Sequence, residues 1–212
     1  MAGTKDEPKK TDRVVARAAE VIRAGGLVIY PTDTVYGIGA DATSDTAIAK
    51  VFQAKARPIE NPIPIAVSSI EMAKKFVKFN PLAEKVFRKM MPGPLTIVLK
   101  TKRGMVPELL TGGTGKIGLR IPDHPIAIKL IELVGGPITS TSANLSGKPA
   151  SLTVREALEQ LGKNVDLVID AGKCKLGKPS TVIDISSGTP KTIREGPTTA
   201  FELNLLLKKL KM

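Results

Sequence analysis

The sequence predicts a mixed α/β protein, of the α+β kind, in which helices flank one twisted mixed β-sheet. Short apolar strand patterns and amphipathic helix patterns interleave along the 212 residues without strict alternation, which favours a mixed sheet over a purely parallel one. Hydrophobic residues make up 42% of the chain and charged residues 25%, the balance of a protein that buries a core. Aromatic residues make up only 3%, so aliphatic side chains must fill that core.

The first elements have clear boundary signals. Residues 1–10 are polar and predict a flexible tail. From Thr11 apolar residues recur at helical spacing until Gly25–Gly26 ends the helix. Leu27–Tyr30 then predicts a short buried strand, which Pro31 terminates.

The next helix begins at Ser44, a favourable N-cap, and runs to about Ala54. It delivers Lys55 and Arg57 just past its end, where side chains can project into a cleft. Later strands are expected at residues 63–67, 95–100, 117–121, 137–141, 166–170, 181–185 and 191–194, and later helices at 70–78, 81–90, 125–134, 153–161 and 199–210. No repeat or linker divides the chain, so residues 11–212 are expected to form a single domain.

Composition excludes several classes of protein. One cysteine, Cys174, excludes an internal disulfide and suits a reducing compartment. No apolar run approaches the ~20 residues of a spanning helix, and the N-terminus lacks a signal-peptide apolar region, so a cytoplasmic protein without membrane contact is expected. The net charge of +12 favours polyanionic partners such as nucleotides, RNA or an acidic protein, although a basic bias of the whole proteome also explains it.

Two polar clusters predict a binding site. Lys55 and Arg57, with Ser142 and Asn144 much later in the chain, can together hold a polyphosphate. Taken alone, Lys-x-Arg is typical of a solvated surface pair. Arg120 lies inside a short apolar strand, where an unpaired guanidinium is costly, so it must extend to solvent, pair with a carboxylate or bind an anionic ligand.

A set of short segments, in a fixed order from about residue 12 to 198, resembles the threonylcarbamoyl-AMP synthase family, the YrdC-like domain. Each segment is weak by itself, but the ordered set is very specific. The segments are Pro-Thr-Asp-Thr-Val-Tyr-Gly (31–37), Lys-Ala-Arg-Pro (55–58), Asn61-Pro62, Pro-Gly-Pro-Leu-Thr (92–96), Thr-Gly-Gly (111–113), Gly-Leu-Arg (118–120), Ser-Thr-Ser-Ala-Asn-Leu-Ser-Gly (140–147), Ser-Thr-Val-Ile-Asp (180–184) and Arg194-Glu195-Gly196.

The resemblance implies an enzyme that joins L-threonine, bicarbonate and ATP into threonylcarbamoyl-AMP and pyrophosphate. That product feeds the synthesis of N6-threonylcarbamoyladenosine in tRNAs that read ANN codons. The resemblance also implies a basic concave groove, Mg²⁺ bound with the ATP and no metal site made by the protein. The expected partners are weakly and electrostatically bound tRNA and a downstream machinery that transfers the threonylcarbamoyl group to tRNA.

The resemblance assigns roles residue by residue. Lys55 and Arg57 are the catalytic cations, because they neutralise charge on the phosphates. The expected ATP-binding residues are Lys55, Arg57, Asn61, Lys116, Ser142, Asn144 and Arg194. The expected threonine-binding residues are Thr32, Thr34, Arg120, Ser140 and Ser180.

Two departures and two alternatives stay open at this point. Ala66 stands where many members of the family carry histidine, and Ala150 replaces a serine of some relatives. His124 does not fill that gap and is expected at the surface or at a helix start. The chain resembles the short, single-domain form of the family. The alternatives are a basic RNA-binding module of the same fold without catalysis and a regulatory or maturation subunit.

Overall fold

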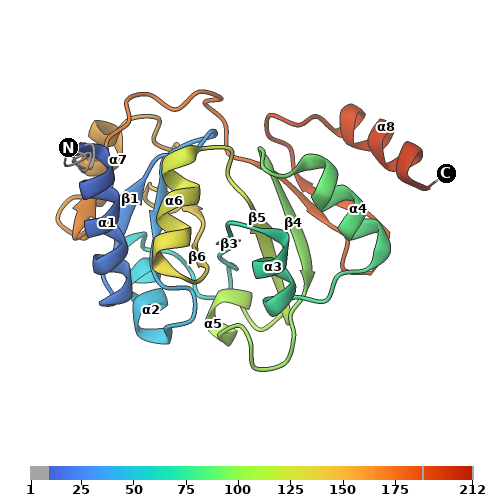
Figure 1. Cartoon of the computed structure of the whole chain (residues 1–212), viewed down its shortest axis with the longest axis horizontal. Coiled ribbons are helices and arrows are strands. Elements are labelled where there is room, and N and C mark those ends of the chain that lie inside the picture. The colour runs from blue at the N-terminus through green and yellow to red at the C-terminus, as the bar shows by residue number, and fades with distance from the viewer. Residues whose placement is uncertain (1–9, 188, 212) are drawn as a thin grey trace, which may run out of the picture.

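The strands of this protein form two mixed sheets rather than the one that the sequence predicted (Figure 1). The computed structural model describes residues 10–187 and 189–211. The smaller sheet has four strands in the order β7-β2-β1-β8, and the larger has six in the order β10-β9-β4-β5-β3-β6. Each sheet contains both parallel and antiparallel pairs, so the prediction of a mixed α/β fold is confirmed.

Most predicted elements form close to their expected bounds. The strands are β1 (Val28–Tyr30), β2 (Gly37–Gly39), β3 (Ile65–Ala66), β4 (Leu95–Lys100), β5 (Lys116–Arg120), β6 (Ile138–Thr139), β7 (Thr141–Ser142), β8 (Leu167–Val168), β9 (Thr181–Asp184) and β10 (Lys191–Arg194). The helices are α1 (Lys10–Arg23), α2 (Asp45–Ala54), α3 (Ile70–Phe76), α4 (Pro81–Met90), α5 (Glu108–Thr111), α6 (Pro125–Val134), α7 (Val154–Leu161) and α8 (Ala200–Lys211). The predicted tail at residues 1–10 lies outside the described residues, apart from Lys10 at the start of α1.

The division into two sheets occurs where one strand was expected at residues 137–141. Residues 138–139 pair with β3 of the larger sheet, whereas residues 141–142 pair with β2 of the smaller sheet. Thr139, which is fully buried, ties this crossing together: its Oγ1 donates to the carbonyl of Ile38 at 2.9 Å and accepts from the amide of Ala40 at 3.0 Å. The crossing leaves Ser140 between the two sheets.

Helices cover the outer faces of both sheets. Figure 1 shows α1 and α6 side by side next to the small sheet, and α4 and α8 beside the large one. Local caps explain where these helices begin: the Ser44 side chain accepts from the amide of Ala47 at 3.3 Å, as predicted, and Asn80 accepts from Ala83 at 2.8 Å before α4. None of the helices in the described part of the chain has the length and apolarity needed to span a bilayer.

Gly112 ends α5 in the left-handed conformation, with φ +54°, and lies against the backbone that follows Arg57. A Cβ at this position would approach the Glu60 carbonyl oxygen to 2.5 Å, whereas a Cβ at the neighbouring Gly113, with φ +75°, would meet nothing within 4 Å. Substitution of Gly113 therefore tests only the strained φ, whereas substitution of Gly112 tests the strained φ together with the collision of a Cβ with Glu60.

We predict that Gly113→Ala lowers the free energy of unfolding by about 1–2 kcal/mol, the cost of a left-handed non-glycine residue. Gly112→Ala should lower it by about 2–4 kcal/mol, because the backbone carrying Glu60 must also shift. Urea denaturation of both variants measures the difference. Equal losses would contradict the close packing of this turn.

Candidate active site

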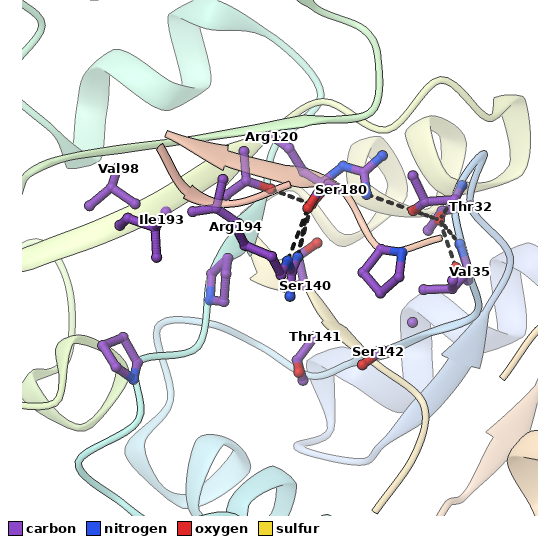
Figure 2. Close-up of a pocket in the computed structure, with 18 of the residues that line it drawn as sticks. Thr32, Val35, Val98, Arg120, Ser140, Thr141, Ser142, Ser180, Ile193 and Arg194 are labelled. Atoms are coloured by element: carbon purple, nitrogen blue, oxygen red, sulfur yellow. Dashed lines mark hydrogen bonds between the residues drawn. The ribbon is translucent and has the colours of Figure 1, made fainter. Parts of the chain in front are cut away.

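A cavity of about 530 Å³ lies between the two sheets (Figure 2). Because side chains alternate along a strand, one face of the large sheet lines the cavity while the other enters the core. Leu95, Ile97 and Leu99 of β4 are fully buried on the core side. The cavity side carries Thr96, Val98, Lys116, Gly118, Arg120, Val182 and Asp184. The small sheet contributes the opposite wall through Tyr30, Gly37, Thr141 and Ser142.

The cavity brings together nine of the twelve residues predicted to bind ATP or threonine. They are Thr32, Thr34, Arg57, Lys116, Arg120, Ser140, Ser142, Ser180 and Arg194. The other three, Lys55, Asn61 and Asn144, do not line it. Segments far apart in sequence therefore converge at this cavity. The ligand that it can bind depends on which of its cations lack a carboxylate partner.

Arg120 is buried, with 4% exposure, and pairs with a carboxylate. Its Nη2 donates to Asp33 Oδ1 at 2.6 Å and its Nη1 donates to Thr34 Oγ1 at 2.9 Å. Of the alternatives left open for Arg120, the structure shows the pairing with a carboxylate. The partner, Asp33, was missed by sequence reasoning although it stands between Thr32 and Thr34. Arg120 Nε and Asp33 Oδ2 have no protein partner in the described structure, so both keep hydrogen-bonding capacity.

Hydroxyl groups surround this buried pair. Thr32 Oγ1 and Thr34 Oγ1 lie 2.9 Å apart, and Thr96 Oγ1 lies 2.8 Å from Ser180 Oγ. Tyr30, also missed at the sequence level, donates its hydroxyl to the carbonyl of Thr139 at 3.2 Å. Burial raises the pKa of Tyr30 to about 12, so its hydroxyl remains protonated in the physiological range. This end of the cavity is rich in neutral donors and acceptors.

Arg57 and Arg194 differ from Arg120 because backbone carbonyls are their partners. Arg57 donates to the carbonyls of Asn61 at 3.1 Å and Pro62 at 3.0 Å, and Arg194 Nη2 donates to that of Ser180 at 2.8 Å. Within residues 10–187 and 189–211, neither guanidinium pairs with a carboxylate. Burial lowers the pKa of Arg194, and the charges of Arg120 and Arg57 lower it further. The cavity therefore holds uncompensated positive charge suited to an anion.

Lys55 is buried, at 1% exposure, and does not line the cavity. Its Nζ donates to the carbonyl of Ser142 and to that of Asn144, the latter at 2.6 Å. Burial, with the nearby charge of Arg57, lowers the pKa of Lys55 to about 7. The buried amine thus joins the end of α2 to the loop that follows β7.

Asn144 itself is held by two contacts to the chain that follows it. Its Nδ2 donates to the carbonyls of Leu145 and Lys148, at 2.8 and 2.7 Å, and its Oδ1 has no partner in the described structure. Asn61 is exposed and supports Arg57 through its carbonyl. Ala66 is fully buried in β3 and does not line the cavity, whereas His124 is the N-cap residue of α6, as expected of a helix start.

Known proteins are similar to this chain in sequence and in architecture. A family model named for Sua5, YciO and YrdC, with the description telomere recombination, matches residues 20–196. A threonylcarbamoyl-AMP synthase of Pyrococcus abyssi is 39% identical over 196 residues, which are 92% of this chain and 57% of that protein. A putative threonylcarbamoyl-AMP synthase of Methanocaldococcus jannaschii is 45% identical over 172 residues, 81% of this chain and 80% of that protein.

A solved structure is similar as well. The crystal structure of P. abyssi Sua5 complexed with L-threonine superposes with a TM-score of 0.87 at 39% identity, over 91% of this chain and 56% of that one. This chain therefore spans little more than half the length of the Pyrococcus protein.

We predict that Lys55 makes stability depend on pH. Because its folded pKa of about 7 lies below the ordinary value of 10.5, the unfolded chain holds a proton that the folded chain lacks between those limits. The contribution of Lys55 to stability should rise as pH increases from about 7 towards 10.5. Urea denaturation should show wild type gaining stability relative to Lys55→Met across that range.

Lys50→Met is the matched control, because Lys50 lies on α2, the helix that Lys55 caps. Lys50 is exposed and also donates to a carbonyl, that of Gly25 at 2.7 Å. The same pH trend in both comparisons would mean that the trend does not arise from the buried amine.

Proposed function

This chain belongs to the Sua5/YciO/YrdC family, and from that premise we propose that it is a threonylcarbamoyl-AMP synthase. In this reaction the amine of L-threonine and bicarbonate form a carbamate and release water. A carbamate oxygen then attacks the α-phosphorus of ATP, and pyrophosphate leaves. This reaction is the first step of N6-threonylcarbamoyladenosine synthesis in tRNAs that read ANN codons.

The observation that carries this proposal is the pairing of two uncompensated guanidinium groups with a hydroxyl-lined end in one cavity. Arg57 and Arg194 suit the polyphosphate of ATP, since a guanidinium donates in a planar fork to phosphate oxygens. Ser142, on the facing wall, adds a hydroxyl. Positioning and charge neutralisation suffice for this chemistry, because the attacking group belongs to the substrate.

The hydroxyl-lined end suits L-threonine. Thr32, Thr34, Ser140 and Ser180 offer donors and acceptors to its amine and side-chain hydroxyl, and Arg120 offers its unpartnered Nε to the carboxylate. Since Asp33 already neutralises most of the charge of Arg120, recognition of the carboxylate here rests on hydrogen bonds more than on net charge. The related Pyrococcus protein was crystallised with L-threonine, which agrees with this assignment.

Lys55 then contributes by positioning. Its buried amine holds the carbonyls of Ser142 and Asn144, so the loop that faces the arginines keeps its shape. The sequence alone suggested a direct phosphate contact by Lys55. Within the proposed function, Arg57 provides that contact and Lys55 supports it.

Mg²⁺ would accompany ATP. The phosphate oxygens of ATP would carry the ion. Among the described residues, no group of three histidine, cysteine, aspartate or glutamate side chains could hold a metal ion. Asn144 does not line the cavity and its Oδ1 is buried, so Asn144 would support the nucleotide site through the loop that follows β7. When bound, Mg²⁺ would neutralise charge on the phosphate oxygens.

We also propose a cytosolic location, since ATP and tRNA are found there, and a basic concave groove formed by the cavity and its rim. The +12 charge favours weak, salt-sensitive tRNA binding, and a separate machinery would transfer the threonylcarbamoyl group to tRNA. The single-domain assignment of residues 11–212 belongs to this proposal.

The deciding experiment measures pyrophosphate release from ATP with L-threonine and bicarbonate present, then with each omitted. Release that requires both substrates is expected. Release without threonine would indicate an unrelated ATPase, and no release together with salt-resistant preference for one tRNA would favour the RNA-binding module.

We predict that Arg57→Ala weakens ATP binding by about 1.5–3 kcal/mol, because it removes charge-assisted bonds to phosphate. Calorimetry with ATP measures this loss. Arg17→Ala is the control, since Arg17 lies on α1 with 69% side-chain exposure and outside the cavity, so it reports the effect of net charge alone. Affinity unchanged by Arg57→Ala would remove Arg57 from the nucleotide site.

A further inference from the structure

The cavity extends past its arginines to an apolar end. Figure 2 shows Val98 and Ile193 at the end of the cavity opposite Thr32 and Val35. Pro62, Pro64, Gly118 and Val182 also line the cavity with apolar surface. If the hydroxyls take threonine and the arginines take the phosphates, this end is left for the nucleoside, whose base can pack its faces on apolar side chains.

An ion pair adds a polar edge to this apolar surface. Lys116 Nζ, from β5, lies 3.0 Å from Asp184 Oδ2, from β9, and both residues line the cavity. Their side chains are 38% and 19% exposed, so the pair is partly covered yet reachable. The other carboxylate oxygen, Oδ1, accepts from the amide of Ser186 at 2.7 Å, which fixes its orientation.

Each member of the pair can make a further hydrogen bond. An ammonium has three donors and Lys116 uses one of them on Asp184, while each carboxylate oxygen has two acceptor positions. Burial alone would raise the pKa of Asp184, but its bonds to Ser186 and Lys116 outweigh burial and leave the pKa below its ordinary value. Asp184 is therefore an acceptor only, and Lys116 a donor only.

We propose that Asp184 and Lys116 select adenine by reading its Watson–Crick edge, an inference that rests on the proposed function. The Asp184 carboxylate accepts from the exocyclic amine at C6, and the Lys116 ammonium donates to N1. Adenine presents a donor, the amine at C6, beside an acceptor, N1. This arrangement matches the acceptor Asp184 beside the donor Lys116. Hypoxanthine presents the reverse, a 6-oxo acceptor beside an N1–H donor, so both contacts become repulsive.

Inosine triphosphate is the probe that isolates this readout, because it differs from ATP at the base edge and carries the same charge. Wild type should bind ATP about 10- to 100-fold more tightly than inosine triphosphate. Asp184→Asn should reduce that ratio at least about fivefold, since an amide can also donate to a 6-oxo group. The loss of one carboxylate should raise affinity for both nucleotides and for inorganic triphosphate equally, which leaves the ratio unaffected by charge.

Asp12→Asn is the matched control. Asp12 forms a similar ion pair, 2.6 Å from Lys129 Nζ, between α1 and α6 outside the cavity. Asp12→Asn removes the same charge as Asp184→Asn and should leave the ratio of ATP affinity to inosine triphosphate affinity at the wild-type value. Thermal denaturation checks that Asp184→Asn folds. If it does not, Lys116→Met replaces it, and the same reduction in the ratio is expected.

The outcomes separate this inference from the proposed function. The readout by Asp184 and Lys116 is overturned if wild type binds ATP and inosine triphosphate equally. It is also overturned if the folded variant keeps the wild-type ratio of the two affinities. In both cases the synthase proposal stands. Wild type that binds no nucleoside triphosphate overturns both. A ratio that falls in Asp184→Asn and not in Asp12→Asn supports the inference.

Discussion

The buried pair of Arg120 and Asp33 is the constraint on which the cavity depends. Arg120 belongs to the large sheet, and Asp33 follows the first strand of the small one, so a contact of 2.6 Å joins the two walls. Both side chains are almost fully buried, at 5% and 6% exposure, and removing one partner of such a pair costs about 3–5 kcal/mol. The pair holds the two sheets at a fixed spacing, and that spacing determines which groups the cavity can present to a ligand.

The cations of the site divide according to their partners. Arg120 has a carboxylate and Lys55 has two carbonyls, and each joins segments that are distant in the chain. Arg57 and Arg194 face the cavity without a carboxylate among the described residues, so their charge is available to a ligand. Cations that are bonded to other segments of the chain therefore hold the site together, and cations without a carboxylate determine the charge that the site attracts. This division explains how a basic protein keeps a folded site that contains several positive charges.

Local sequence signals predicted helices better than strands. Ser44 marked the start of α2 because a cap acts within one turn, and Gly25–Gly26 marked the end of α1 for the same reason. The sequence missed β2, since Gly37–Gly39 has no strand pattern and depends on pairing with β1. The division of residues 137–141 between two sheets was also invisible, because a short apolar run does not specify its partner strand.

The sequence by itself determined the fold class, most helices and the residue types of the site, because capping, periodicity and ordered motifs are local properties of the chain. Of the twelve binding residues that the sequence predicted, nine line the cavity. Only the tertiary structure decided their partners: that Arg120 meets Asp33, that Lys55 lies inside the wall and that Lys116 meets Asp184 across the large sheet. The physical reason is that the energy of a charged group depends on burial and on the atoms within hydrogen-bonding distance, and both arise only when distant segments come together.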